Sequence, residues 1–184
     1  MQYELQEFFD SVHDPRRKQG QRHLFYNILT IIIMAILSGH QGLRGFSRFA
    51  QANAEELTLA LRLKHGVPSY STFQAMLTEL DDQMLSAQFI QWVKSIVPSD
   101  ADRFIALDGK SIRSTTNGGN TKLQNFVALV NAFGHQSGLV YGMQSYENNK
   151  SGEAQALRDL IVKLGLRGIV FTMDALHTQN NRLG

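Results

Sequence analysis

Two aspartates in the second half of the chain each follow a short apolar segment. Asp108 comes after residues 104–107 and is followed by Gly109 and Lys110, and Asp174 comes after a second apolar stretch. An aspartate before glycine is a common turn residue, and an aspartate after a strand is a common helix N-cap. Two carboxylates brought together at one sheet edge would instead bind a hard cation such as Mg²⁺.

The elements around these aspartates must decide between the two interpretations. β-branched and aromatic residues predict four strands, at residues 103–108, 125–133, 138–146 and 168–175. Residues 152–166 have a helical apolar period and contain a C-cap signal at Gly165. A three-strand meander followed by a crossover helix returns the fourth strand parallel to the first. If the fourth strand lies on the outer side of the first, Asp108 and Asp174 come side by side.

The first part of the chain has a different pattern, which predicts a helical bundle. Residues 24–37 are apolar nearly all round, but they are too few for a membrane span, which needs about 20 residues. Asn53, three residues before Glu56, predicts a capped helix from 54 to about 64. Because Pro98 closes this part, we expect a helical domain at 1–99 and a sheet domain at 100–184.

Composition excludes several classes of protein and of site. The chain of 184 residues has 43% hydrophobic residues, a net charge of +2 and no cysteine, which excludes disulfides and cysteine metal sites. The acidic N-terminal segment lacks the basic start of a signal peptide, so we expect a cytoplasmic protein with no membrane partner. The six histidines show no metal-binding spacing.

Five segments resemble one family of bacterial mobile-element proteins. "ALDGKSIRST", "FTMDALHTQ", "NKSGEAQAL", "DPRRKQGQRH" and "GVPSYSTF" resemble segments of the ISAs-type, or H-repeat-associated, insertion-sequence transposases. The resemblance implies an RNase H-like DDE fold, so that residues 100–184 would form a partial β-β-β-α-β catalytic domain. It also implies DNA strand cleavage and transfer with Mg²⁺ or Mn²⁺, in which Asp108 and Asp174 match the first two catalytic acids and bind the metal.

The same resemblance predicts an incomplete site. The third acid of the family is a glutamate well downstream of the second motif, and this chain ends at Gly184. We therefore expect a truncated transposase that is inactive alone, with weak or absent metal binding. The alternative is a non-catalytic DNA-binding or regulatory remnant. Glu153 and His177 match family motifs, and each is expected either to support the site or merely to occupy a helix start. An unpaired fourth strand would also expose a sheet edge for self-association.

Basic residues supply candidates for contacts with DNA phosphates. One cluster lies in the loop between the first two predicted helices, and two cations follow Asp108: Arg16, Arg17, Lys18, Arg22, Lys110 and Arg113. Lysine and arginine next to a nuclease site commonly bind phosphate. Solvated loop charge is the alternative interpretation for every one of them.

Overall fold

The computed structural model describes residues 2–98, 100–112, 126–147 and 152–173, and the side chains of residues 2–6 and 19 are not described. The chain forms two compact units, residues 1–81 and residues 82–184. This division differs from the boundary expected near residue 99. The reason is helix α6, Asp82–Ile96, whose apolar side packs against the sheet and therefore belongs to the second unit.

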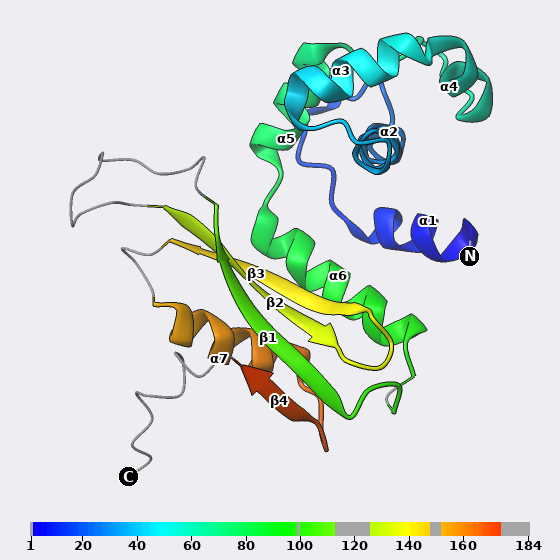
Figure 1. The fold of residues 1–184 in the computed structure, drawn as a ribbon. Helices are drawn as coiled ribbons and strands as arrows, with labels where there is room; N and C mark the ends of the chain where they lie inside the picture. Colours follow the sequence, from blue (N-terminus) through cyan, green and yellow to red (C-terminus); the bar gives the residue numbers. More distant parts are fainter. Residues whose placement is uncertain (1, 99, 113–125, 148–151, 174–184) are drawn as a thin grey trace. The chain divides into compact units, whose positions relative to one another are not determined.

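The first unit is helical, as the sequence predicts. Its elements are α1 (Gln2–Ser11), a short 3-10 helix η1 (Lys18–Gly20), α2 (Phe25–Leu37), α3 (Gly42–Ala52), α4 (Ala54–Ala60) and α5 (Tyr70–Glu79). Helix α2, seen nearly end-on in Figure 1, carries three side chains with no exposed surface, Ile28, Ile31 and Ala35. No single described helix is long and apolar enough to cross a membrane; α2 and α3 meet that test only as a pair, which is bent by 98°.

The cap expected at Asn53 does not form. Helix α4 ends at Ala60, and the Asn53 amide donates to the Phe49 carbonyl at 2.8 Å, in the last turn of α3. Helix α5 has a side-chain cap, because the Ser69 hydroxyl accepts a hydrogen bond from the Thr72 amide.

The second unit contains a four-stranded mixed sheet in the order β3-β2-β1-β4. Its strands are β1 (Phe104–Ser111), β2 (Val127–Gly134), β3 (Val140–Glu147) and β4 (Val170–Met173). β1 and β3 pair antiparallel with β2, whereas β4 pairs parallel with β1 on its outer side. Both the meander and the return of the fourth strand, which were predicted from the sequence, are confirmed (Figure 1).

Helices α6 and α7 (Glu153–Leu164) cover one face of this sheet. Their apolar side chains, which include Ile90 and Leu160, form one core with alternate residues of β1 and β2, such as Ile105 and Val130. Gly142 lets the layers approach closely, because a Cβ there would lie 2.7 Å from the Ile90 side chain. The Ser86 hydroxyl donates to the Met143 carbonyl, so α6 also covers the backbone of edge strand β3.

The other face of the sheet is not covered by either described helix of the second unit. Strand alternation turns its residues away from the core. Several are exposed apolar side chains, namely Phe104, Phe133, Met143 and Val170, with exposed fractions of 37–47%. This uncovered face is therefore partly apolar.

A buried carboxylate ties the start of β1 to the hairpin between β2 and β3. Asp102 is 2% exposed and accepts hydrogen bonds from the Gln136 amide at 2.6 Å, the Ser137 amide at 3.0 Å and the Tyr141 hydroxyl at 2.9 Å. Burial raises the pKa of Asp102, but the hydrogen bonds from Ser137, Gln136 and Tyr141 outweigh it and hold the pKa at about 2. Asp102 therefore stays ionised at neutral pH and holds the start of β1 against the hairpin between β2 and β3.

Candidate functional site

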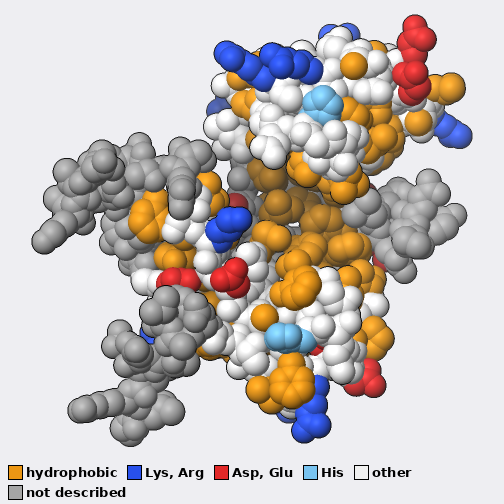
Figure 2. All heavy atoms as spheres, in the orientation of Figure 1, with side chains coloured by type: hydrophobic (Ala, Val, Ile, Leu, Met, Phe, Trp, Pro, Cys, Tyr) orange, Lys and Arg blue, Asp and Glu red, His pale blue; other side chains and the backbone are white. Residues whose placement is uncertain are grey.

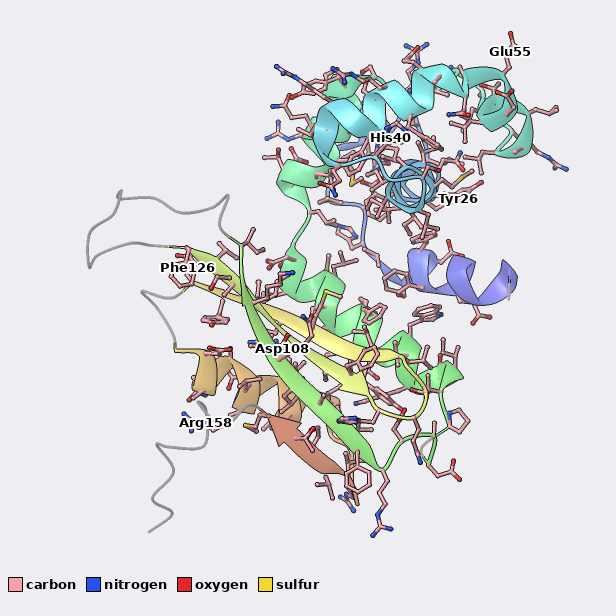
Figure 3. The ribbon with its side chains drawn as sticks, in the orientation of Figure 1. Tyr26, His40, Glu55, Asp108, Phe126 and Arg158 are labelled. Carbon is pink, nitrogen blue, oxygen red and sulfur yellow. The ribbon has the colours of Figure 1, made fainter. Side chains whose placement is uncertain are left out.

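Asp108 lies inside β1, not at its end. It pairs with Asn131 of β2, and the strand continues through three more residues to Ser111. The turn interpretation of Asp108 and Gly109 is therefore wrong, because both residues belong to the strand ladder. The Asp108 side chain is exposed and lies on the uncovered face, since Ile105 and Leu107 point into the core (Figure 3).

The Asp108 carboxylate has no hydrogen-bond or ion-pair partner among the described residues. Its two oxygens are thus available to a ligand from solution.

The parallel pair of β1 and β4 reaches the residues just before the two aspartates. The last paired residues in the described part of the two strands are Leu107 and Met173, and each of them is followed in the sequence by an aspartate. Asp174, His177 and Arg113 lie outside the described residues. The described part of the sheet therefore has the strand order and register on which the acidic pair depends.

Glu153 comes to β1 from the covered side. It is the first residue of α7, and its carboxylate occupies the place where a Cβ on Gly109 would stand. Because Gly109 follows Asp108 in an extended strand, the two acids approach neighbouring backbone positions from opposite faces. The pKa of Tyr146 is raised, first by burial and then by the negative charge of Glu153. Glu153 thus contacts the strand next to Asp108, but it does not share its face.

No group of three or more histidines, cysteines or acids that could hold a metal ion occurs among the described residues. The described residues alone therefore do not form a complete metal site at Asp108.

The basic loop of the first unit is organised by Arg16, which is 6% exposed. Its guanidinium donates to both carboxylate oxygens of Asp14 at 2.9 Å, to the Gly20 carbonyl at 3.1 Å and to the His23 carbonyl at 2.8 Å. Burial raises the pKa of Asp14, but the hydrogen bonds and charge of Arg16, with a contribution from His13, leave it below its usual value. Arg16 therefore holds the loop together from inside, which differs from the expected surface contact.

The other cations of this loop face solvent. Arg17, Lys18 and Arg22 are exposed, and so is Lys110 in β1. Lys110 and Asp108 lie on the same face of the strand, two residues apart. Figure 2 shows acidic and basic side chains next to each other on the sheet, bordered by hydrophobic ones.

Comparison with known proteins gives a consistent answer. Residues 6–93 match the family model described as "DDE_Tnp_1-associated". The chain is 25% identical over 177 residues to the H repeat-associated putative transposase YhhI of Escherichia coli K12. The aligned region is 96% of this chain and 46% of YhhI. It is also 25% identical over 177 residues to the H repeat-associated putative transposase YbfD of the same strain, covering 69% of YbfD. The chain is thus similar along nearly its whole length to H repeat-associated putative transposases.

A further relative in this family comparison is an uncharacterised protein from the dhlA 3′ region of Xanthobacter autotrophicus. It is 28% identical over 174 residues, covering 94% of this chain and 58% of the relative. The chain thus spans about half the length of several of the relatives that it matches. The family model ends at residue 93, within α6 and beyond the first compact unit.

Two residues with clear structural roles were not recognised as such from the sequence. Asp102 precedes a strand without a motif around it, and its partners lie more than 30 residues away. Arg16 stood in a run of cations that all looked alike. Only the nearby Asp14 and Gly20, within four residues of it, were a signal for its internal bonding.

Proposed function

We propose that this chain is the first part of a DDE transposase, in which an RNase H-like sheet presents Asp108 and Asp174 to Mg²⁺ and DNA. The observation that carries the proposal is the parallel pairing of Leu107 with Met173, because each of these residues directly precedes one of the two aspartates. Similarity to putative transposases supports the same proposal, since a transposase acts on DNA. The helices and the strand order β3-β2-β1-β4 fit the expected topology.

The described residues fit a hard divalent cation. Asp108 offers two exposed oxygens without a described partner, and oxygen is the ligand that Mg²⁺ and Mn²⁺ prefer. Asp108 and Asp174 would hold the ion. When bound, such an ion activates an attacking water or hydroxyl and stabilises the leaving oxygen of a phosphodiester.

The chain's own residues would orient the DNA at this position. Lys110 lies on the Asp108 face, where its ammonium can bind a neighbouring phosphate. Gly109 keeps β1 close to α7, so that Glu153 supports the backbone that carries Asp108. Glu153 is thus proposed as a positioning residue.

Metal binding by the purified chain tests this proposal. Mn²⁺ added in small amounts should broaden the NMR signals of residues 106–110 and 171–173. Asp108→Asn should abolish this broadening, whereas Asp100→Asn, which changes another exposed aspartate before β1, should leave it in place. The same preparation should show little or no Mg²⁺-dependent nicking of DNA. An absence of broadening near Asp108, or its persistence in Asp108→Asn, would contradict the proposal.

A second candidate function is DNA binding without cleavage. It is favoured by the exposed cations Arg17, Lys18 and Arg22, which Arg16 fixes in one loop of the first unit. DNA binding with a steep salt dependence, together with no Mn²⁺ effect at Asp108, would support this function over the first.

A further inference from the structure

A small basic pocket lies in the first unit. Its cavity of ≈ 220 Å³ is lined by residues of two loops and the start of α2: Arg22, His23, Leu24, Asn27, Arg62, Leu63, Lys64 and His65. Small-molecule sites usually measure about 300–1,000 Å³, so this cavity suits a smaller group. Three of the lining residues are cations and none is an acid.

The N-terminus of α2 opens into this pocket. Leu24 is the N-cap residue and has no side-chain acceptor, so no side chain caps the first turn of the helix. The α2 helix has 13 residues, and its first-turn amides carry the positive end of the helix dipole. Helix ends of this kind bind anions through backbone N–H groups.

Asn27 supplies an independent sign of a missing ligand. Its side chain is only 4% exposed, yet its Oδ1 has no hydrogen-bond partner among the described residues. A buried carboxamide oxygen without its partner costs free energy, so this group calls for an explanation, and a bound ion or water is one that the lining of the pocket allows. Because rotation about the Cβ–Cγ bond exchanges oxygen and nitrogen, the carboxamide can present an N–H to an anion.

The cations are held at the pocket by the folds of their loops. Arg62 has a φ of 51°, in the left-handed region that residues other than glycine rarely adopt. Strained backbone of this kind is found most often at binding sites. On the other side, Arg16 bonds to the His23 carbonyl and so fixes the loop that carries Arg22.

The electrostatic environment of His23 is positive, as expected for a pocket that binds an anion. The pKa of His23 is lowered, first by burial and then by the charges of Arg22, His65 and Arg16. The His23 and His65 rings face each other edge-on with centroids 6.3 Å apart. A bound anion would reduce the repulsion among these groups.

We propose that the pocket formed by Arg22, Asn27, Arg62 and Lys64 at the start of α2 binds a backbone phosphate of DNA. This inference rests on the proposed function, because it takes DNA as the source of the phosphate. It assigns that contact to a defined pocket with an uncapped helix end, and not to the exposed basic loop in general.

Matched pairs of variants separate the pocket from net charge. Arg22→Ala/Lys64→Ala removes two exposed cations of the pocket, and Arg44→Ala/Arg48→Ala removes two exposed cations of α3. Binding of a short DNA duplex is measured at several salt concentrations for each protein. The pocket variant should bind the duplex about tenfold more weakly, and to the same degree for every DNA sequence. Its plot of log K against log salt should be shallower than that of wild type, with a slope smaller in magnitude by about 2. The α3 variant should change much less.

NMR locates the contact. Titration of the wild-type chain with the duplex, and separately with inorganic phosphate, should shift the amide signals of the first turn of α2 and the side-chain amide of Asn27. Equal weakening by both double variants, or no shift at Asn27 with either probe, would overturn the proposal. A shift with phosphate but not with the duplex would identify free phosphate as the ligand and reject DNA as its source.

Failure here is distinguishable from failure of the proposed function. The Mn²⁺ test reports on Asp108 in the second unit, whereas the duplex and phosphate tests report on α2 in the first. Loss of the pocket signals with intact Mn²⁺ broadening would reject only the pocket.

Discussion

Replacing Asp102 by asparagine should destabilise the sheet unit in a pH-dependent way. The carboxylate accepts three hydrogen bonds that join β1 to the hairpin between β2 and β3. Asparagine has nearly the same shape and keeps one oxygen for the two backbone amides, but it removes the charge. Asp102→Ala is more severe, because it leaves the Gln136 and Ser137 amides and the Tyr141 hydroxyl without their acceptor.

The magnitude follows from the pKa of Asp102, which falls from 3.8 to about 2 on folding. At 1.36 kcal/mol per pKa unit the shift corresponds to a ceiling of about 2.4 kcal/mol. We expect Asp102→Asn to lose about 1–2 kcal/mol of this, because the remaining oxygen keeps the hydrogen bonds from the two backbone amides. For Asp102→Ala, with its unpaired donors, a loss of about 3 kcal/mol or more is expected.

The sign of the pH effect is fixed by the direction of the shift. Since the folded pKa lies below the unfolded value of 3.8, the stabilisation is present above pH 3.8 and is lost as the pH falls toward 2. Urea unfolding should therefore show wild type more stable than Asp102→Asn at neutral pH, with a gap that narrows below pH 4. Asp100→Asn, at an exposed position two residues earlier, is the control and should match wild type. A gap that is the same at all pH values would refute the assigned ionisation.

Three further predictions concern packing and association. Gly109→Ala should lower the free energy of unfolding by about 1–3 kcal/mol, because the new methyl group displaces the Glu153 carboxylate, and Glu153→Ala in the same chain should recover much of that loss in urea unfolding. Arg16→Met should lower the free energy of unfolding of the first unit by about 3 kcal/mol, because it leaves the Asp14 carboxylate unpaired and removes the hydrogen bonds to the loop. Arg17→Met changes an exposed side chain and should stay within about 0.5 kcal/mol of wild type in the same urea unfolding. Val170→Lys on edge strand β4 should reduce self-association in sedimentation experiments; an unchanged sedimentation profile would argue against pairing through β4.

The arrangement of strands was predictable because each step rests on a local rule. Runs of β-branched and aromatic residues located the four strands, and the preference for short antiparallel links and a helical crossover predicted that the fourth strand runs parallel to the first, as β4 does on the outer side of β1. The end of β1 was not predictable in the same way. Gly109 is a poor strand residue by propensity, yet pairing with Val130 and the close approach of Glu153 keep it in the ladder.

Roles that depend on distant partners were harder to predict. Arg16 and Arg17 are adjacent and chemically identical, but one is buried among loop carbonyls and the other is exposed. The unpartnered Asn27 looked like a polar interruption in an apolar helix, and its meaning depends on the loop around Arg62, which lies more than 30 residues away. Rules based on neighbouring residues do not predict which side chains are buried by distant segments, nor which buried side chains are left without a hydrogen-bond partner.

The position of α6 has a practical consequence for dividing this chain into fragments. A fragment cut where the family model stops, at residue 93, would carry most of an amphipathic helix whose apolar partners, Ile105 and Val130 among them, remain in the other piece. The complementary sheet fragment would lose the cover over the backbone of β3 and would become prone to aggregate. Expression of residues 1–81 and 82–184 as separate proteins respects the packing and should give better-behaved samples of each unit.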